Sequence, residues 1–258
     1  MDPVAHTFAG AALAAAGLKR ATPLAGAALV LGANAPDVDV FAYFAGSYDA
    51  IAFRRGLTHG VLALAIWPFV LAGLLLGWDR WVRRRRDPTA APARAGPLLA
   101  LSALAVATHP ALDWLNNYGM RWLMPFDGRW SYGDALFIVD PWVWLILGGA
   151  AFLTFSKSRI ARVRWTVFAL VASWVVVGTA EVPPLTRVLW VAGIAALLGA
   201  RWWLGAASPV ALERTAQGAL GLTVVYIVVM VSSSAAARAD VRAAVAARGI
   251  TPEAVMVA

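Results

Sequence analysis

The sequence predicts an all-α, polytopic membrane helix bundle, with about six full spanning helices and a short helical hairpin at the N-terminus. Of its 258 residues, 61% are hydrophobic and only 14% are charged, which is too little polar surface to coat a water-soluble globule. Several apolar runs also approach or reach the roughly 20 residues that a helix needs to cross a bilayer. The chain is therefore expected to be covered by lipid.

The predicted hairpin occupies the first 36 residues, which are apolar but interrupted at residues 17–23 by a turn that contains Lys19 and Arg20. The interruption leaves two stretches of about 14 residues, too short to span well, so a partly inserted hairpin is expected. Positive charge follows the apolar segment instead of preceding it. We therefore expect the N-terminus to be retained rather than cleaved as a signal peptide.

Six longer apolar runs predict the spanning helices: residues 60–78, 97–115, 136–155, 163–180, 185–203 and 218–231. An alanine-rich run with arginines, residues 232–248, then predicts an amphipathic or surface helix closed by Gly249, and residues 251–258 resemble the opening of a strand. The expected organisation is a membrane-embedded domain with the chemistry (1–155), additional transmembrane helices as scaffold (156–234), and an extramembrane tail or truncated domain (235–258).

The distribution of positive charge predicts the orientation. Alternating helices place fourteen Lys and Arg residues on the side that holds Lys19 and residues 83–86, and eight on the other side. The positive-inside rule assigns the first side to the cytoplasm. The run of four arginines at 83–86 is interpreted as a topology signal facing anionic lipid, so membrane lipid is an expected partner and nucleic acid is not.

Six histidines and aspartates are expected to meet at the opposite, outer side, because each lies at an element end that the topology places there. Ionisable groups at membrane depth are costly unless they are paired or ligated. The chain has no cysteine, so a metal would need imidazole and carboxylate ligands, which suit zinc before manganese or iron. One or two divalent ions are expected. The candidate metal ligands are His6, Asp37, Asp39, His59, His109 and Asp113.

Structural alternatives remain open for these residues. His6 could be an interfacial group near a helix start, and Asp37 could cap a helix. His59 could form a capping pair with Thr58, and His109 could be a satisfied core histidine. For Asp113 the helical spacing is informative, since a residue four positions after His109 shares its face of the helix.

Further polar residues at the outer side could take part in the site. Arg55, four residues before His59, is expected at the rim of the site, where it could neutralise a phosphate or an oxyanion, or it could be an interfacial arginine with its charge in water. Asn116 and Asn117 could position water or substrate, or form a helix C-terminal turn. Asp140 stands directly before a proline, which is the pattern of a helix N-cap.

Over about residues 1–155 the chain resembles the YdjM-type family of bacterial inner-membrane, metal-dependent hydrolases. The resemblance rests on the order of the motifs AHTFAG, NAPDVD, RRGLTHG, HPALDWLNNYGMRWLMPF and YGDALFIVDPW. The resemblance implies that the six candidate ligands form a metal site, with Asp134 and Asp140 nearby. It departs at Arg54 and Gly60, where the family pattern has a histidine and a serine. That family is distantly similar to zinc-dependent phospholipase C and the P1-type nucleases, which implies phosphoester cleavage.

The leading hypothesis is thus a metal-dependent phosphoesterase that acts at the periplasmic or external face of the inner membrane, on a lipid or another phosphoester. A bound metal lowers the pKa of a water to about 7, Asp39 or Asp113 would serve as general base, and Arg55 would stabilise the transition state. One alternative is a proton-coupled carrier with an intramembrane relay through His109 and Asp113. The other is a metal-stabilised membrane protein without turnover.

Overall fold

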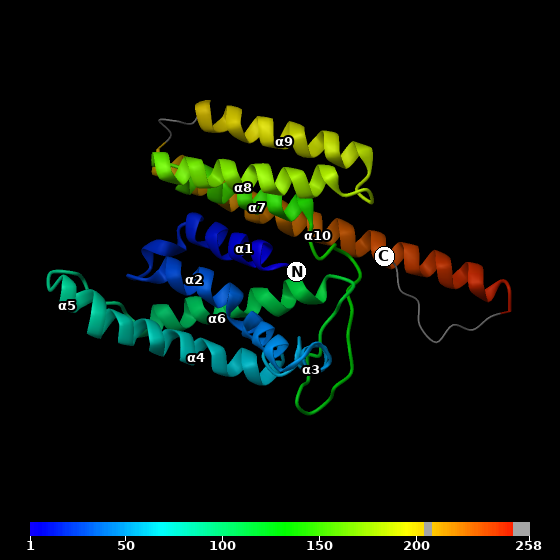
Figure 1. The fold of residues 1–258 in the computed structure, drawn as a ribbon, viewed down its shortest axis with the longest axis horizontal. Coiled ribbons are helices and arrows are strands. Elements are labelled where there is room, and N and C mark those ends of the chain that lie inside the picture. Colours follow the sequence, from blue (N-terminus) through cyan, green and yellow to red (C-terminus); the bar gives the residue numbers. More distant parts are fainter. Residues whose placement is uncertain (204–207, 250–258) are drawn as a thin grey trace.

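The computed structural model describes residues 1–203 and 208–249, and apart from two isolated β-bridges the regular structure of these residues is helical. Figure 1 shows the helices running roughly side by side along one axis, as expected for a membrane bundle. The all-α prediction is therefore confirmed. The strand suggested at residues 251–258 lies outside the described part of the chain.

The N-terminal hairpin is formed by α1 (Pro3–Ala15) and α2 (Ala25–Asn34), which are joined through the short helix η1 (Leu18–Arg20). Asp2 starts α1 by accepting hydrogen bonds from the main-chain nitrogens of Val4 and Ala5. The two helices lie close together at Gly10, where a Cβ would come within 2.5 Å of the carbonyl oxygen of Leu29. The hairpin fills the centre of the bundle, between α6 and α7.

Five of the described helices are long and apolar enough to cross a membrane. They are α4 (Val61–Trp78) with its continuation through η3 (Asp79–Arg83) and α5 (Arg84–Arg86), α6 (Ala95–Trp114), α8 (Arg159–Gly178), α9 (Pro184–Trp203) and α10 (Pro209–Ala246). The run at 136–155 yields only the 15-residue α7 (Pro141–Phe155), because Asp140 and Pro141 start the helix late. This element is shorter than the full span that the sequence predicts.

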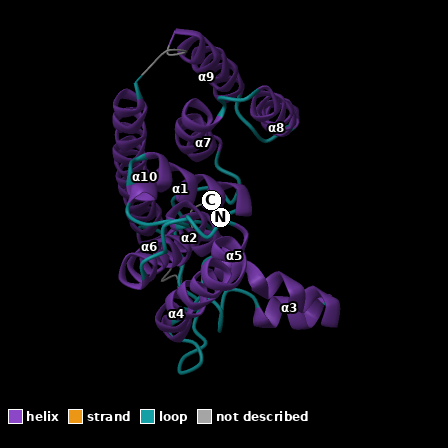
Figure 2. Cartoon of the chain, turned by 90° about the vertical axis from the view of Figure 1, so that its left-hand side faces the viewer, coloured by secondary structure: helices purple, strands orange, loops and turns teal. Residues whose placement is uncertain are grey.

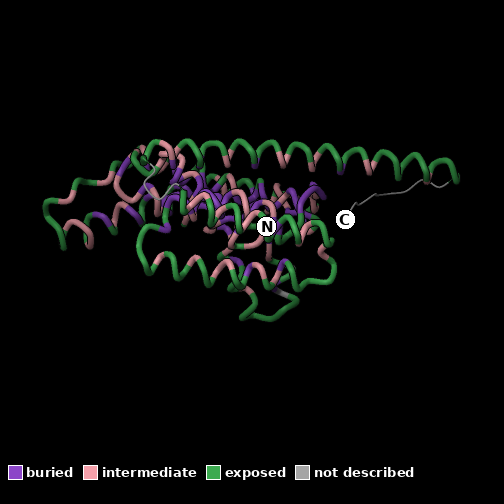
Figure 3. Tube along the Cα trace, turned by 90° about the horizontal axis from the view of Figure 1, so that it is seen from above, coloured by how far each residue is buried: buried purple, intermediate pink, exposed green. Residues whose placement is uncertain are grey.

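The last helix differs from its prediction. The apolar run at 218–231 and the alanine-rich run after it form one continuous helix, α10, of 38 residues. Neither glycine nor proline separates the two runs, so nothing interrupts the helical hydrogen bonds. At 1.5 Å per residue α10 is about 57 Å long, which exceeds the roughly 30 Å of hydrocarbon. Figures 1 and 3 show its exposed C-terminal part extending beyond the bundle.

The basic turns gather at one end of the bundle. Arg20 pairs with Glu213 at the start of α10, Arg94 donates to the carbonyl of Ala21, and Arg201 donates to Ser156. The opposite end holds the 3-10 helix η2 (Ala35–Ala45), α3 (Ser47–Phe53) and the long segment from 115 to 140. These contacts place the segments on the two sides as the helix alternation predicts.

Candidate metal centre

The six candidate ligands lie together at the end of the bundle opposite the basic turns. One comes from the first turns of α1, two from η2, one from the turn before α4, and two from the last turns of α6. Five of them are buried and the sixth, Asp37, has a side chain that is 14% exposed. The structure thus brings together His6, Asp37, Asp39, His59, His109 and Asp113.

His59 and His109 direct a ring nitrogen at each other, with 3.0 Å between their Nε2 atoms. The Nδ1 of His109 donates to the carbonyl oxygen of Ala33 at 2.6 Å, which leaves its Nε2 with a lone pair. The Nδ1 of His59 lies 2.8 Å from the Thr58 hydroxyl and 3.4 Å from an Asp39 oxygen, so the proton is favoured on Nδ1 here too. Two lone pairs therefore face the same small space.

Burial keeps His59 in its ligand form. Loss of hydration disfavours the charged imidazolium and lowers the pKa of His59 below its usual value, although Asp113 and Asp39 oppose this effect. A neutral imidazole is the form that binds a metal. The His59 side chain is therefore prepared to act as a ligand at neutral pH.

Asp113 lies at the middle of the cluster. One of its oxygens is 3.2 Å from Nε2 of His6, and the other is 3.4 Å and 3.5 Å from Nε2 of His59 and His109. An oxygen of Asp37 is 3.9 Å and 3.8 Å from the same two nitrogens. Ligand atoms bound about 2 Å from one cation lie at comparable separations from each other, so the set fits a divalent ion.

Two overlapping groups have the ligand types and spacing of a metal site: His6 with His109 and Asp113, and Asp37 with His59 and His109. Within each group the ligand atoms all lie within 4.8 Å of one another. His109 belongs to both groups, yet it has one available nitrogen because Nδ1 is bound to Ala33. The two groups therefore cannot each hold an ion through His109.

Arg55 is buried inside the cluster, not at its rim as the sequence suggested. Its Nε and Nη2 each lie 3.1 Å from an oxygen of Asp113, and its Nη1 donates to Asn116 at 3.0 Å. The guanidinium also stacks over the Tyr118 ring at 4.4 Å. The amino group of Met1 contacts Asp113 as well. Asp113 therefore has the guanidinium of Arg55 and the amino nitrogen of Met1 beside it, in addition to the three histidines.

Arg54 is a member of the cluster that the sequence reasoning missed. Its guanidinium lies 3.4 Å from an oxygen of Asp37 and 3.4 Å from an oxygen of Asp39, and it stacks on the Tyr43 ring at 5.8 Å. The signal that could have found Arg54 is its place in the motif, because it stands where the resembled family pattern has a histidine.

Two of the remaining candidate residues contact the cluster. Thr58 donates to Asp39 at 3.3 Å and lies beside His59. Asn116 binds Arg55 and also accepts from the main-chain nitrogen of Tyr118 at 2.9 Å. These contacts hold the arginine and one imidazole in place.

The other three candidates make their contacts elsewhere. Asp140 caps α7 by accepting from the main-chain nitrogens of Trp142 and Val143, both at 3.0 Å, as its Asp-Pro pattern indicated. Asp134 lies 3.6 Å from Arg238 of α10. Together with Asn117, it lines a separate cavity against α10. Their contacts tie the outer segment to the scaffold helices.

Close packing at Gly60 explains why this chain has glycine where the family pattern has serine. A Cβ at this position would lie 2.8 Å from the carbonyl oxygen of Met124 and 3.1 Å from that of Trp122. The segment after α6 therefore crosses the main chain too closely for serine at position 60. This close approach covers the turn that carries His59.

Comparisons with known proteins agree with the motif order. The family model described as "YdjM inner membrane protein" matches residues 1–183, a range that contains all six candidate ligands. The "Uncharacterized protein YfhP" of Bacillus subtilis (strain 168) is 24% identical over 191 residues, which cover 66% of this chain and 54% of YfhP. The chain thus spans about half the length of that relative. No solved structure matches the chain.

Proposed function

The chain belongs to the YdjM inner membrane protein family, and on that premise we propose that it is a membrane-bound, metal-dependent hydrolase that cleaves a phosphoester. The observation that carries this proposal is the meeting of His59 and His109 through Nε2 atoms 3.0 Å apart, beside the carboxylates of Asp37 and Asp113. A buried structural histidine pair needs no such set of additional acidic neighbours.

We propose a single divalent cation, zinc before manganese or iron, held through His109 with His59 and Asp37, which leaves the Asp113 carboxylate beside the ion and not bound to it. The ligand types suit these ions, and a second ion would have to be held without His109. Such a cation supplies Lewis-acid polarisation of a phosphoryl oxygen and acidifies a water molecule. His6 stacks on the His109 ring at 3.7 Å between ring centroids and contributes a further nitrogen beside Asp113.

The two candidate general bases have different surroundings. Asp39 accepts from the main-chain nitrogen of Arg55 at 2.9 Å and from Thr58 at 3.3 Å, so it is suited to orienting His59. Asp113 lies beside both Nε2 atoms and is suited to accepting a proton from a water at that point. We assign the orienting role to Asp39 and the proton-accepting role to Asp113.

The two arginines favour a phosphoester over an uncharged substrate. Arg55 is bound within the cluster and Arg54 lies at its partly exposed side, next to Asp37. Asp37 and Arg54 have side chains that are 14% and 23% exposed, so a substrate would approach the cluster from this side. Guanidinium groups there would bind a phosphate and offset the charge that develops during cleavage.

The experiment measures metal content and turnover on the same preparation. Purified protein is analysed by elemental mass spectrometry and then assayed for release of phosphate or headgroup from a panel of phospholipids and soluble phosphoesters. We expect bound metal and activity in the wild type and neither in His109→Ala. Asp127→Asn is the matched control, because Asp127 lies in the outer segment and pairs only with nearby Arg129 in the described residues.

Other outcomes would favour the alternatives. Bound metal without release of any product from the panel would favour a metal-stabilised protein without turnover. Loss of function in Glu181→Gln equal to that in His109→Ala would favour a carrier, since Glu181 lies in the turn before α9, far along the chain from the cluster. Absence of metal from the wild type after metal supplementation would reject the proposal.

A further inference from the structure

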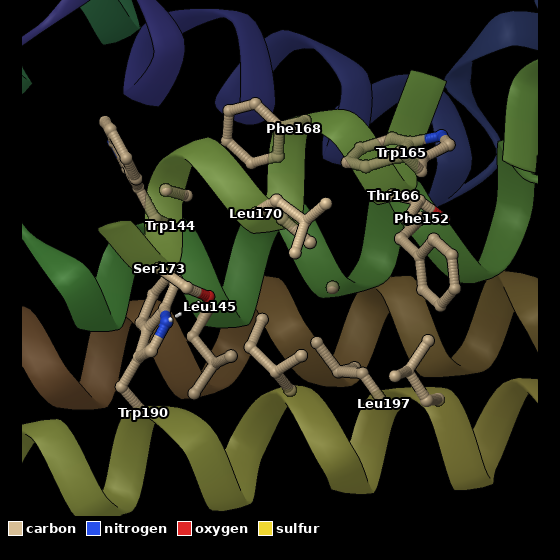
Figure 4. A pocket seen from close by; sticks show the side chains of 16 residues that line it. Trp144, Leu145, Phe152, Trp165, Thr166, Phe168, Leu170, Ser173, Trp190 and Leu197 are labelled. Carbon is tan, nitrogen blue, oxygen red and sulfur yellow. Dashed lines mark hydrogen bonds between the residues drawn. The ribbon is translucent and has the colours of Figure 1, made fainter. Parts of the chain in front are cut away.

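A second feature of the molecule lies away from the histidine cluster, in the space between α7, α8 and α9. Figure 2 shows these helices as three corners of a triangle. The space holds a cavity of about 210 Å³ with an almost entirely apolar lining. Figure 4 shows Trp165 and Phe152 at one end of this groove and Trp144 and Trp190 at the other. We call it the α7–α9 groove.

The lining has few polar atoms, and some of them are already engaged. The Ser173 hydroxyl accepts from the Trp190 indole at 3.0 Å. The aromatic lining packs on itself, with Phe152 and Trp165 ring centroids 5.7 Å apart and Trp144 and Phe168 5.8 Å apart. The groove therefore offers mainly hydrocarbon contact, which suits an apolar ligand better than a polar one.

The position of the groove exposes it to lipid. Two of its walls are candidate membrane spans, and α8 buries only Ala172 and Val176 among its described residues. Its lining on α8 extends from Trp165 to Ser173, about 12 Å at 1.5 Å per residue. This length is close to half of the roughly 30 Å of hydrocarbon. The lining is centred on the middle of α8, so the groove can hold part of an acyl chain that runs inward from the basic end of the bundle.

Positive charge lies where the headgroup of a lipid in that leaflet would be. A second cavity, of about 600 Å³, adjoins the groove and shares Trp165 and Phe168 with it, while Arg164 and Ser158 complete its polar side. Arg164 is exposed and forms no ion pair with a carboxylate of the described residues. Residues 157–164 hold four basic side chains and no acidic one.

We propose that the α7–α9 groove binds one anionic phospholipid of the leaflet at the basic end of the bundle. An acyl chain lies along the apolar lining, and the phosphate lies in the adjoining cavity against Arg164. The charge complementarity selects an anionic lipid over a zwitterionic one. The headgroup end of this site, at Arg164, lies at the end of the bundle opposite the histidine cluster, and its occupancy does not depend on catalysis.

The test is native mass spectrometry of delipidated protein in detergent, titrated with phosphatidylglycerol or phosphatidylcholine. The wild type is expected to retain one phosphatidylglycerol molecule in preference to phosphatidylcholine. Arg164→Gln should weaken phosphatidylglycerol binding about fivefold, the effect of one basic residue near the surface, and leave phosphatidylcholine unchanged. Arg162→Gln, which removes the same charge outside the cavity lining, should behave as the wild type.

A second pair of variants tests the groove itself. Ala169→Phe fills the lining and is expected to abolish retention of the lipid. Val171→Phe adds the same bulk on an exposed part of α8 and should keep it. Equal effects of the two arginine variants, or lipid retained by Ala169→Phe, would overturn the proposal. So would loss of a dimer instead of a lipid in Ala169→Phe, because the groove would then be an interface between two copies of the chain.

Discussion

The Nε2 atoms of His59 and His109 lie 3.0 Å apart, although the two residues are 50 positions apart in the chain. Each ring is oriented from its other nitrogen, by Thr58 and Asp39 in one case and by the Ala33 carbonyl in the other. In metal-ligating histidines the ring nitrogen that does not bind the metal typically forms such a hydrogen bond, which fixes the orientation of the ring.

Removal of His109 should affect metal binding more than removal of His6. His109 belongs to both three-residue groups, whereas His6 belongs to one. We expect His109→Ala to lower metal affinity by more than about 100-fold, beyond the range for outer hydrogen-bond partners, and His6→Ala to lower it less. Competition titration with a chelating dye measures both. Equal losses would mean that His6 is as central as His109, and the single-ion arrangement would be wrong.

Thr58 should matter through its hydroxyl group. The hydroxyl lies between Asp39 and Nδ1 of His59, so it helps to fix the ring and its proton. Thr58→Val, which keeps the shape, should lower metal affinity about 10- to 100-fold, whereas Thr58→Ser should remain near the wild type. The same dye competition serves here. A serine variant as weak as the valine variant would show that the methyl packing matters instead.

Gly60 should tolerate no side chain. A Cβ would lie 2.8 Å from the Met124 carbonyl oxygen, and a main-chain oxygen in a packed segment cannot easily move away. Gly60→Ser should therefore destabilise the protein by about 1–3 kcal/mol, seen as a lower Tm in detergent. Gly73→Ser is the matched control, since nothing lies within 4 Å of its Cβ position. An unchanged Tm in Gly60→Ser would contradict the close approach.

Asp140 should act on stability and not on the metal. It caps α7 through Trp142 and Val143 and accepts a further hydrogen bond from Tyr226 of α10 at 2.9 Å. Asp140→Ala should cost about 1–2 kcal/mol, the usual effect of losing an N-cap. Metal affinity of the folded fraction should stay as in the wild type. If Asp140→Ala lowered the metal affinity as much as Thr58→Val does, Asp140 would instead be part of the metal site.

The orientation in the membrane is open to a direct measurement. The positive-inside rule places Arg85 in the cytoplasm and Gly128, in the segment beside the histidine cluster, outside. Fusions of alkaline phosphatase, which is active only outside, should be active at Gly128 and inactive at Arg85. The reverse pattern would place the candidate site on the cytoplasmic side.

Much of the fold and of the site followed from the sequence, because both depend on helix alternation. The hairpin turn at Lys19, the spans α4, α6, α8 and α9, and the gathering of the histidines at one end all follow from where apolar runs begin and end. Asp140 shows the same logic locally, since an aspartate before proline starts a helix. These features need no knowledge of side-chain packing.

The differences arise where tertiary contacts decide. Whether Arg55 lies at a rim or inside depends on Asp113, Asn116 and Tyr118, which arrive from a distant segment. Arg54 was missed for the same reason, because its partners Asp37 and Asp39 lie on another element. The Ala33 carbonyl that orients His109 could not be foreseen, since a main-chain oxygen has no signature in the sequence.

The unbroken helix α10 has a mechanical consequence. It is fixed near one end by the pair of Glu213 with Arg20 and towards the other by Arg238, which contacts Asp134 and the Gly133 carbonyl. The two anchors are 25 positions apart in the helix, which corresponds to about 37 Å of rigid rod. A rod anchored at both polar faces cannot shorten to follow a thinner bilayer, so the protein must tilt or thicken the lipid around it. The length of α10 between its two anchors thus sets the bilayer thickness at which the protein fits without tilting.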